Sequence, residues 1–237
     1  MARVFSILII TALLLSNCHK NEYEALPTDI GHSYLPLNIG SEFIYKADSV
    51  KYGFNGTKPN GDSVTFFIKE TVVLKIEDST KTTYTLARYH SKDSTNWVFI
   101  KNHFYEVEKF RINHKENNII TTNLVFPVEP YYYWNGNELN HLDSKEYEYT
   151  MVDFDYKVFS KTYPHSLKVR MDSTDNLRER KIESEIFSKS NGLIYSETIN
   201  VSLINNDSLD NNGNVVLQRP PKIEKGIIFI KGLIRRN

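Results

Sequence analysis

Apolar and polar residues alternate along most of this chain, and this alternation constrains the fold more than any other feature. In the segment 63–78 one face of an extended chain carries six apolar residues: Val64, Phe66, Ile68, Val72, Leu74 and Ile76. Lysines and threonines mostly occupy the other face. Successive side chains of a strand point to opposite sides of the sheet, so this pattern predicts one long, half-buried strand.

Shorter runs of the same kind follow. They cover residues 82–89, 97–101, 104–112, 119–126 and 167–171, with turns expected at Asn102-His103 and over 113–118. Asn191-Gly192, between the runs 178–187 and 193–203, is the strongest hairpin signal in the chain. In the run 147–159 the apolar residues change face, which predicts a β-bulge or a sharp bend.

Two segments allow an alternative to a strand. Residues 178–187 could form a helix, but Leu177, Ile182 and Ile186 fit a helical face poorly, so a strand is favoured. The apolar segment 226–236 has only half the length that a membrane span needs and is read as a closing buried strand. No amphipathic helix of 12 residues or more is found downstream of Cys18. We therefore expect an all-β fold, with a single antiparallel β domain of about ten strands over residues 34–237, shaped as a bent sheet or half-barrel.

The amino terminus has the pattern of a secretory signal peptide. Arg3 is the only charge before Cys18, and Val4–Leu15 is an apolar run of 12 residues interrupted only by Ser6 and Thr11. That run is too short to cross a bilayer, which takes about 20 residues. A buried helix is the alternative, but polar sequence follows at once. We assign residues 1–17 to a cleaved signal peptide and residues 18–33 to a polar tether.

Cys18, the single cysteine, follows the apolar run directly, in Leu15-Ser16-Asn17-Cys18. This arrangement resembles the lipobox of bacterial lipoproteins. The resemblance implies cleavage before Cys18, transfer of diacylglycerol to its thiol and acylation of the new amino group, for example with palmitate. A coincidental free thiol is the alternative. The expected partner is then the membrane, reached through an N-terminal lipid, and the expected location is the cell envelope.

Three further segments resemble one family of Gram-negative lipoproteins without a known activity. They are Tyr34–Tyr45, with the pattern YxPLxxGxxxxY; Phe126-Pro127-Val128 followed by Trp134-Asn135-Gly136-Asn137; and Ser190–Tyr195. The resemblance implies a lipid-anchored β domain outside the cytoplasm and brings no reaction and no site residues. Physically, Pro36 bars a helix, Gly40 permits a tight turn, and Phe43 and Tyr45 begin a strand, so the first segment is interpreted as scaffold.

Composition excludes several classes of protein. There are 29 Lys and Arg against 29 Asp and Glu, so no general attraction to nucleic acid is expected. Removal of Arg3 with the signal peptide leaves 28 basic against 29 acidic residues, a net charge of about −1. One cysteine cannot form an internal disulfide or a cysteine-rich zinc module.

No catalytic motif is found, so no catalytic residue, metal ligand or cofactor is predicted. The seven histidines are interpreted as solvated turn residues, with His103 and His114 at opposite ends of a strand and too far apart to share a metal. Carboxylate pairs such as Glu183/Glu185 have basic neighbours and fit a solvated strand face. The loop 205–214 carries oxygen ligands but lacks the order of a calcium loop.

The most suggestive local feature is an aromatic and amide patch. It consists of Tyr131, Tyr132, Tyr133, Trp134, Asn135 and Asn137. Aromatic faces and amides can stack on and hydrogen-bond a sugar, although packing in the core or in an interface is the simpler interpretation.

Three hypotheses for function follow from the sequence. The first is a non-enzymatic binding or structural module of the cell envelope, with an envelope protein as partner. The second is a glycan-binding accessory lipoprotein that uses the patch, and the third is a hydrolase with an unrecognised site.

Overall fold

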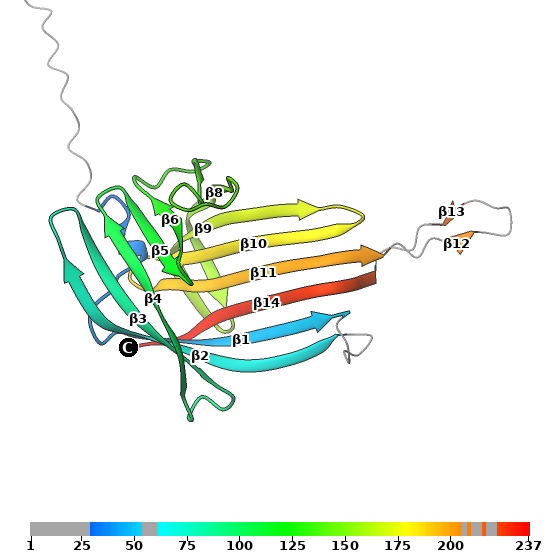
Figure 1. The fold of residues 1–237 in the computed structure, drawn as a ribbon, viewed down its shortest axis with the longest axis horizontal. Coiled ribbons are helices and arrows are strands. Elements are labelled where there is room, and N and C mark those ends of the chain that lie inside the picture. The colour runs from blue at the N-terminus through cyan, green and yellow to red at the C-terminus, as the bar shows by residue number, and fades with distance from the viewer. Residues whose placement is uncertain (1–28, 54–60, 205–207, 210–214, 217–221) are drawn as a thin grey trace, which may run out of the picture.

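The computed structural model describes residues 29–53, 61–204, 208–209, 215–216 and 222–237, and most of them lie in strands (Figure 1). A single turn of 3₁₀ helix, η1 (His32–Tyr34), precedes the strands in this part of the chain. The strands are β1 (Glu42–Tyr52), β2 (Asp62–Glu77), β3 (Lys81–Ser91), β4 (Val98–Glu108), β5 (Arg111–Glu116), β6 (Ile119–Val125), β7 (Tyr133–Asn135), β8 (Glu146–Val158), β9 (Lys161–Asp175), β10 (Glu179–Ser188), β11 (Gly192–Ile204), β12 (Ser208–Leu209), β13 (Val215–Val216) and β14 (Lys222–Arg236).

Twelve of these strands form one sheet in the order β6-β5-β4-β3-β2-β1-β14-β11-β10-β9-β8-β7, and β12 pairs with β13 separately. Each pairing is antiparallel. Two meanders, β1–β6 and β7–β11, therefore lie on either side of β14, which inserts between β1 and β11. The expectation of a single antiparallel all-β domain is confirmed.

The sheet curls until its two outer edges meet. The Thr122 amide of β6 donates to the Gly136 carbonyl at 2.9 Å, and the Trp134 indole N–H of β7 donates to the Thr122 carbonyl at 2.7 Å. The buried hydroxyl of Tyr149, on β8, both accepts from the Val125 amide and donates to the Val125 carbonyl, each at 2.8 Å. Figure 1 shows β3–β6 folded across the end of the long strands, which gives the expected half-barrel.

The core fills the inside of this half-barrel. Its largest fully buried aromatic side chains are Tyr45, Tyr149, Tyr163 and Phe187. Tyr34, Leu35 and Leu37, from the YxPLxxGxxxxY segment, are also buried in this core. Gly40 has a φ of +83° at the turn before β1, so the segment is the scaffold that the sequence indicated.

The predicted strand over 63–78 is present as β2, but its six apolar residues do not share one buried face. Ile68 and Val72 are buried, whereas Val64, Leu74 and Ile76 are exposed. The register against β3 shifts between Val72 and Leu74. Residues 73–77 beyond this bulge are exposed on both faces of the strand, Val73 included, so only the middle of β2 is half-buried and the prediction was wrong at both of its ends.

Two expected turns are also corrected. Of the turn expected over 113–118, residues 113–116 belong to β5 and only Asn117-Asn118 form the turn. Asn102 and His103 lie within the continuous strand β4, and the chain reverses instead at Lys109-Phe110, inside the predicted strand 104–112. The bend predicted in 147–159 is confirmed, because the pairing of β8 with β9 shifts register three times. The segments 178–187 and 226–236 are strands, as favoured.

Residues 29–33, assigned from the sequence to the tether, already contact the sheet. Asp29 accepts hydrogen bonds from the Gly31 amide at 2.9 Å and from Ser33. The His32 ring lies 4.7 Å from the Phe126 ring, centroid to centroid, and its Nε2 is 3.1 Å from the Glu108 carbonyl oxygen. Cys18, the segment 1–17 predicted to be a signal peptide and most of the loop 205–214 lie outside the described residues. Within the described ranges, no helix combines the length and the apolar character that a membrane crossing needs.

Candidate functional site

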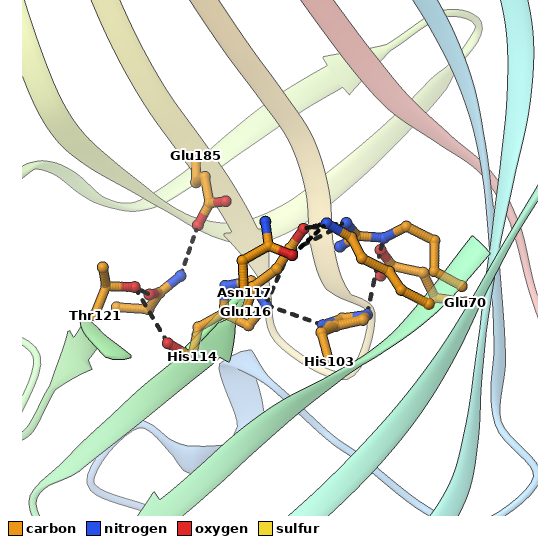
Figure 2. A network of polar contacts seen from close by, with 10 residues as sticks. Glu70, His103, His114, Glu116, Asn117, Thr121 and Glu185 are labelled. Carbon is orange, nitrogen blue, oxygen red and sulfur yellow. Dashed lines mark hydrogen bonds and ion pairs between the residues drawn. The ribbon is translucent and has the colours of Figure 1, made fainter. Parts of the chain in front are cut away.

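Charged and imidazole side chains gather inside the half-barrel, where the strand pattern alone would place apolar residues. They form the group that we call the histidine–glutamate cluster: Glu70 (β2), Arg88 (β3), Lys101 and His103 (β4), and His114 and Glu116 (β5). Neighbouring strands bring them together, since Glu70 pairs with Arg88, and Arg88 pairs with Lys101 (Figure 2). Buried polar groups are costly unless they are paired, so a cluster of this size inside a fold is a candidate for function.

Arg88 holds the two carboxylates of the cluster. Its Nε donates to Glu70 Oε1 at 2.8 Å, and its Nη1 donates to Glu116 Oε1 at 2.9 Å and Oε2 at 3.1 Å. Lys101 pairs with Glu116 as well. Two cations thus balance two carboxylates, and loss of one partner would leave a buried charge uncompensated, at a cost of about 3–5 kcal/mol.

Electrostatics keep both carboxylates ionised. Burial by itself would raise the pKa of Glu70, but the positive charges of Lys231 and Arg88 hold it well below its usual range. Burial likewise opposes ionisation of Glu116, but Lys101 and Arg88 lower its pKa to about 2. Both side chains are therefore anionic at neutral pH.

The two histidines face each other directly. His103 Nδ1 lies 2.9 Å from His114 Nε2, and the rings are perpendicular, with their centroids 5.1 Å apart. Tyr105 stacks on the His114 ring at 4.8 Å and fixes its orientation. Burial lowers the pKa of His103 to about 4 and that of His114 to about 3, so both rings are neutral at pH 7 and share one hydrogen bond.

This arrangement corrects the sequence-based interpretation of the histidines. His103 has no exposed surface, and His114 is only partly exposed. The turn at Lys109-Phe110 folds β5 back on β4, so Tyr105 pairs with His114 and places it beside His103. That turn has no glycine, asparagine or proline, which is why it was missed. The pattern His114-Lys115-Glu116, with two ligand types on one strand face, is the signal that was available.

A second group of polar side chains continues from the cluster toward β10. Thr121 Oγ1 donates to Asn123 Oδ1 at 2.9 Å, and Asn123 Nδ2 donates to Glu185 Oε2 at 3.2 Å, as Figure 2 shows. Burial raises the pKa of Glu185 to about 7, against the opposing charge of Lys231. Glu185 was expected on a solvated face, but it is buried and its carboxylate is bound by Asn123 of β6.

The aromatic and amide patch divides into two parts. Tyr131, Tyr132 and Tyr133 are exposed, at 69%, 47% and 50% of their surface. Trp134, Asn135 and Asn137 are bound internally. The Trp134 ring lies 4.6 Å from the Tyr149 ring. Asn135 Oδ1 accepts from the amides of Asn137 and Lys145, and Asn137 Nδ2 donates to the Asp143 carbonyl at 2.7 Å. These three residues hold the closing edge of the sheet, and the three tyrosines form what we call the tyrosine face.

An open pocket of about 540 Å³ lies away from both features. It is bounded by Val64 and Phe66 on β2, His90 on β3 and Val98 on β4, with the turn 92–96 at one side. Its walls are mainly hydrocarbon, and Asp93 at its rim is engaged in hydrogen bonds with its own turn.

Fold and site together define the class of this protein: an antiparallel half-barrel whose interior carries a histidine–glutamate cluster. No family model and no curated protein matches the sequence. Among solved structures, the chain is similar to a protein described as exported, with a YmcC-like fold, from Bacteroides fragilis (TM-score 0.48, 10% identity, 86% of this chain and 98% of that chain covered). It is also similar to a protein described as a lipoprotein from Parabacteroides distasonis (TM-score 0.41, 10% identity, the same coverage). The assignment of function therefore depends on this chain's own residues.

Proposed function

We propose that this chain is a lipid-anchored protein of the cell envelope, attached through Cys18, whose half-barrel acts as a non-enzymatic binding or structural module. The observation that carries the proposal is the single cysteine placed directly after an apolar run of 12 residues that begins behind Arg3. A short apolar run followed by a lipid-accepting cysteine gives an anchored protein rather than a membrane-spanning one.

The fold is compatible with such an anchor. The described structure starts at Asp29, where the chain already contacts the sheet. Residues 18–28 link this point to the proposed lipid, and a segment of that length reaches at most about 40 Å when fully extended. The half-barrel would therefore stay within one domain diameter of the membrane surface.

Replacement of the cysteine tests the anchor. Cys18→Ala should release the protein from the membrane fraction and abolish labelling with radioactive palmitate, because the thiol and the new amino group are the lipid acceptors. Ser16→Ala, two residues away, is the matched control and should remain in the membrane fraction. A Cys18→Ala protein that still sediments with membranes and still incorporates palmitate would refute the proposal.

The tyrosine face favours a second candidate function, the binding of a glycan. Tyr131, Tyr132 and Tyr133 are three consecutive exposed aromatic residues, and exposed aromatic rings can stack on the apolar faces of sugar rings. Tyr133 is also fixed by a hydrogen bond to Glu148, which raises the pKa of its hydroxyl. Trp134 does not belong to this surface, since its N–H already binds the Thr122 carbonyl.

Glycan-array binding provides the test. The double variant Tyr131→Ala/Tyr132→Ala should lose binding, whereas Phe110→Ala, which removes an exposed ring from the β4–β5 turn, should keep it. An array on which the wild type binds no glycan, or on which the double variant binds like the wild type, excludes this function for the tyrosine face.

A further inference from the structure

Three side chains of the histidine–glutamate cluster have the composition and the spacing of a metal centre. One ligand atom from each of His103, His114 and Glu116 lies within 4.8 Å of the other two. Two imidazole nitrogens and one carboxylate oxygen, with a fourth position left open, are a common ligand set of Zn²⁺. We propose that His103, His114 and Glu116 bind a single Zn²⁺ ion, an assignment that is independent of the lipid anchor.

The two nitrogens are placed where one ion can bridge them. His103 Nδ1 and His114 Nε2 are 2.9 Å apart and point at each other. Two nitrogens bound to the same tetrahedral zinc, with bonds of about 2.0–2.1 Å, are about 3.3 Å apart. An ion bound to both nitrogens lies beside the line that joins them, so the rings separate by a few tenths of an ångström and each turns its lone pair toward the ion, which replaces the hydrogen bond. In the tautomer in which His114 Nε2 donates to His103 Nδ1, the proton on His114 Nε2 moves through solvent to Nδ1 of the same ring, so the charge of the imidazole does not change.

A buried nitrogen without a partner supports this assignment. The Nε2 atom of His103 is buried and makes no hydrogen bond. Glu70 Oε1 lies 3.6 Å from this nitrogen. Metal-bound histidines usually donate their second ring N–H to a carboxylate, which orients the ring and raises the basicity of the ligand. With Nδ1 bound to the ion, Nε2 of His103 carries the proton and faces the carboxylate that Arg88 holds in place.

Glu116 is positioned as a ligand through one oxygen only. Its Oε2 faces the imidazole, at 3.6 Å from His114 Nε2. Its Oε1 accepts the shorter of the two Arg88 hydrogen bonds, at 2.9 Å, and also pairs with Lys101. Both cations can stay on Oε1 while Oε2 binds the ion, and hydrogen bonds to the second oxygen of a carboxylate ligand are a normal part of metal sites.

The site is accessible from one side. The side chains of His114 and Glu116 are 18% and 23% exposed, whereas that of His103 is fully enclosed. An ion can therefore enter past His114 and Glu116, and a water molecule can fill the fourth position from the same side. Two imidazole nitrogens among the three ligands favour Zn²⁺ and its neighbours among the transition metals over Mg²⁺ and Ca²⁺, which prefer all-oxygen sites.

Zinc binding by the full chain in detergent tests this site. After treatment with EDTA and dialysis, calorimetric titration with ZnCl₂ should give one Zn²⁺ per chain, and MgCl₂ should give no heat of binding. His114→Gln should abolish this binding, and Glu70→Gln should weaken it by about 10–100-fold through the orientation of His103. His141→Ala, which removes an exposed loop imidazole, is the matched control and should bind like the wild type.

A second measurement covers variants that fail to fold. Melting curves recorded in EDTA show whether His114→Gln is folded. If it is not, X-ray absorption at the zinc edge of the wild type decides, because two imidazoles give a characteristic outer-shell scattering pattern. The proposal is overturned if the wild type binds no Zn²⁺ at micromolar concentration, if folded His114→Gln keeps the wild-type affinity, or if the spectrum shows no imidazole.

Discussion

Glu185 should make the stability of this protein fall as the pH rises. Its pKa is about 7 in the folded protein against an ordinary value of 4.5, because burial disfavours its charged form. The groups that face it are Lys231 of β14, which lowers the pKa, and Glu183 and Glu70, which raise it; Asn123 of β6 donates a hydrogen bond to it. The folded state therefore binds this proton more tightly than the unfolded state does. The resulting stability is complete below pH 4.5 and is lost as the pH rises toward 7.

The magnitude follows from the two pKa values. A difference of about 2.5 units at about 1.4 kcal/mol per unit sets an upper limit of about 3 kcal/mol. Between pH 5 and pH 8 the loss is about 2–3 kcal/mol. His103 and His114 have the opposite effect. Their pKa values are about 4 and 3 in the folded protein against an ordinary value of 6.5, so the unfolded state binds these protons more tightly and the stability falls as the pH drops below 6.5. The two effects partly cancel in the wild type, so the comparison with a variant isolates the contribution of Glu185.

The variant is Glu185→Gln, which keeps the shape of the side chain and cannot ionise. Urea unfolding should give similar free energies of unfolding for the two proteins at pH 5. At pH 8 the variant should have gained about 2–3 kcal/mol relative to the wild type. Glu179→Gln, the same change at the surface end of β10, is the control and should show a constant difference. A difference between Glu185→Gln and wild type that does not change from pH 5 to pH 8 would refute the reasoning.

Two further substitutions test the interior and the closed edge. Arg88→Met leaves the carboxylates of Glu70 and Glu116 without their guanidinium partner. It should lower the free energy of unfolding, measured with urea at pH 7, by about 3–5 kcal/mol. A loss below about 1 kcal/mol would show that these ion pairs do not stabilise the interior. Tyr149→Phe leaves the Val125 amide unpaired and should lower the free energy of unfolding by about 1–3 kcal/mol, measured by urea unfolding. An unchanged free energy of unfolding would contradict the role of this hydroxyl at the closed edge.

The fold was largely predictable from local patterns. The period of two identified most strands, and Asn191-Gly192 marked the turn between β10 and β11. The change of face in 147–159 indicated the irregular pairing of β8 with β9. Each of these signals depends on residues close in sequence. By contrast, nothing local indicated that β14 inserts between β1 and β11, because one edge of β14 pairs with β1, from the opposite end of the described chain.

The candidate site was not predictable for the same reason. His103 and His114 come together only through the turn at Lys109-Phe110, which has none of the residues that usually mark a turn. Glu70 lies on the same strand face as the apolar residues Ile68 and Val72, where the alternating pattern gives no reason to expect a charge. Its pairing with Arg88 depends on the register of β2 against β3, which the sequence does not show. The tyrosine face was found from the sequence, but its separation from Trp134 required the contact with Thr122.

The central position of β14 has a consequence for when the protein can fold. Phe43 of β1 pairs with Arg236 of β14, so the two halves of the sheet join only after almost the whole described chain is available. Contacts between residues this distant in sequence form slowly, because the entropy of closing the loop is lost before the contacts compensate for it. Each meander alone would expose one unpaired long strand, β1 or β11. With this order of assembly, the twelve-stranded sheet is complete only when β14 has paired with both meanders.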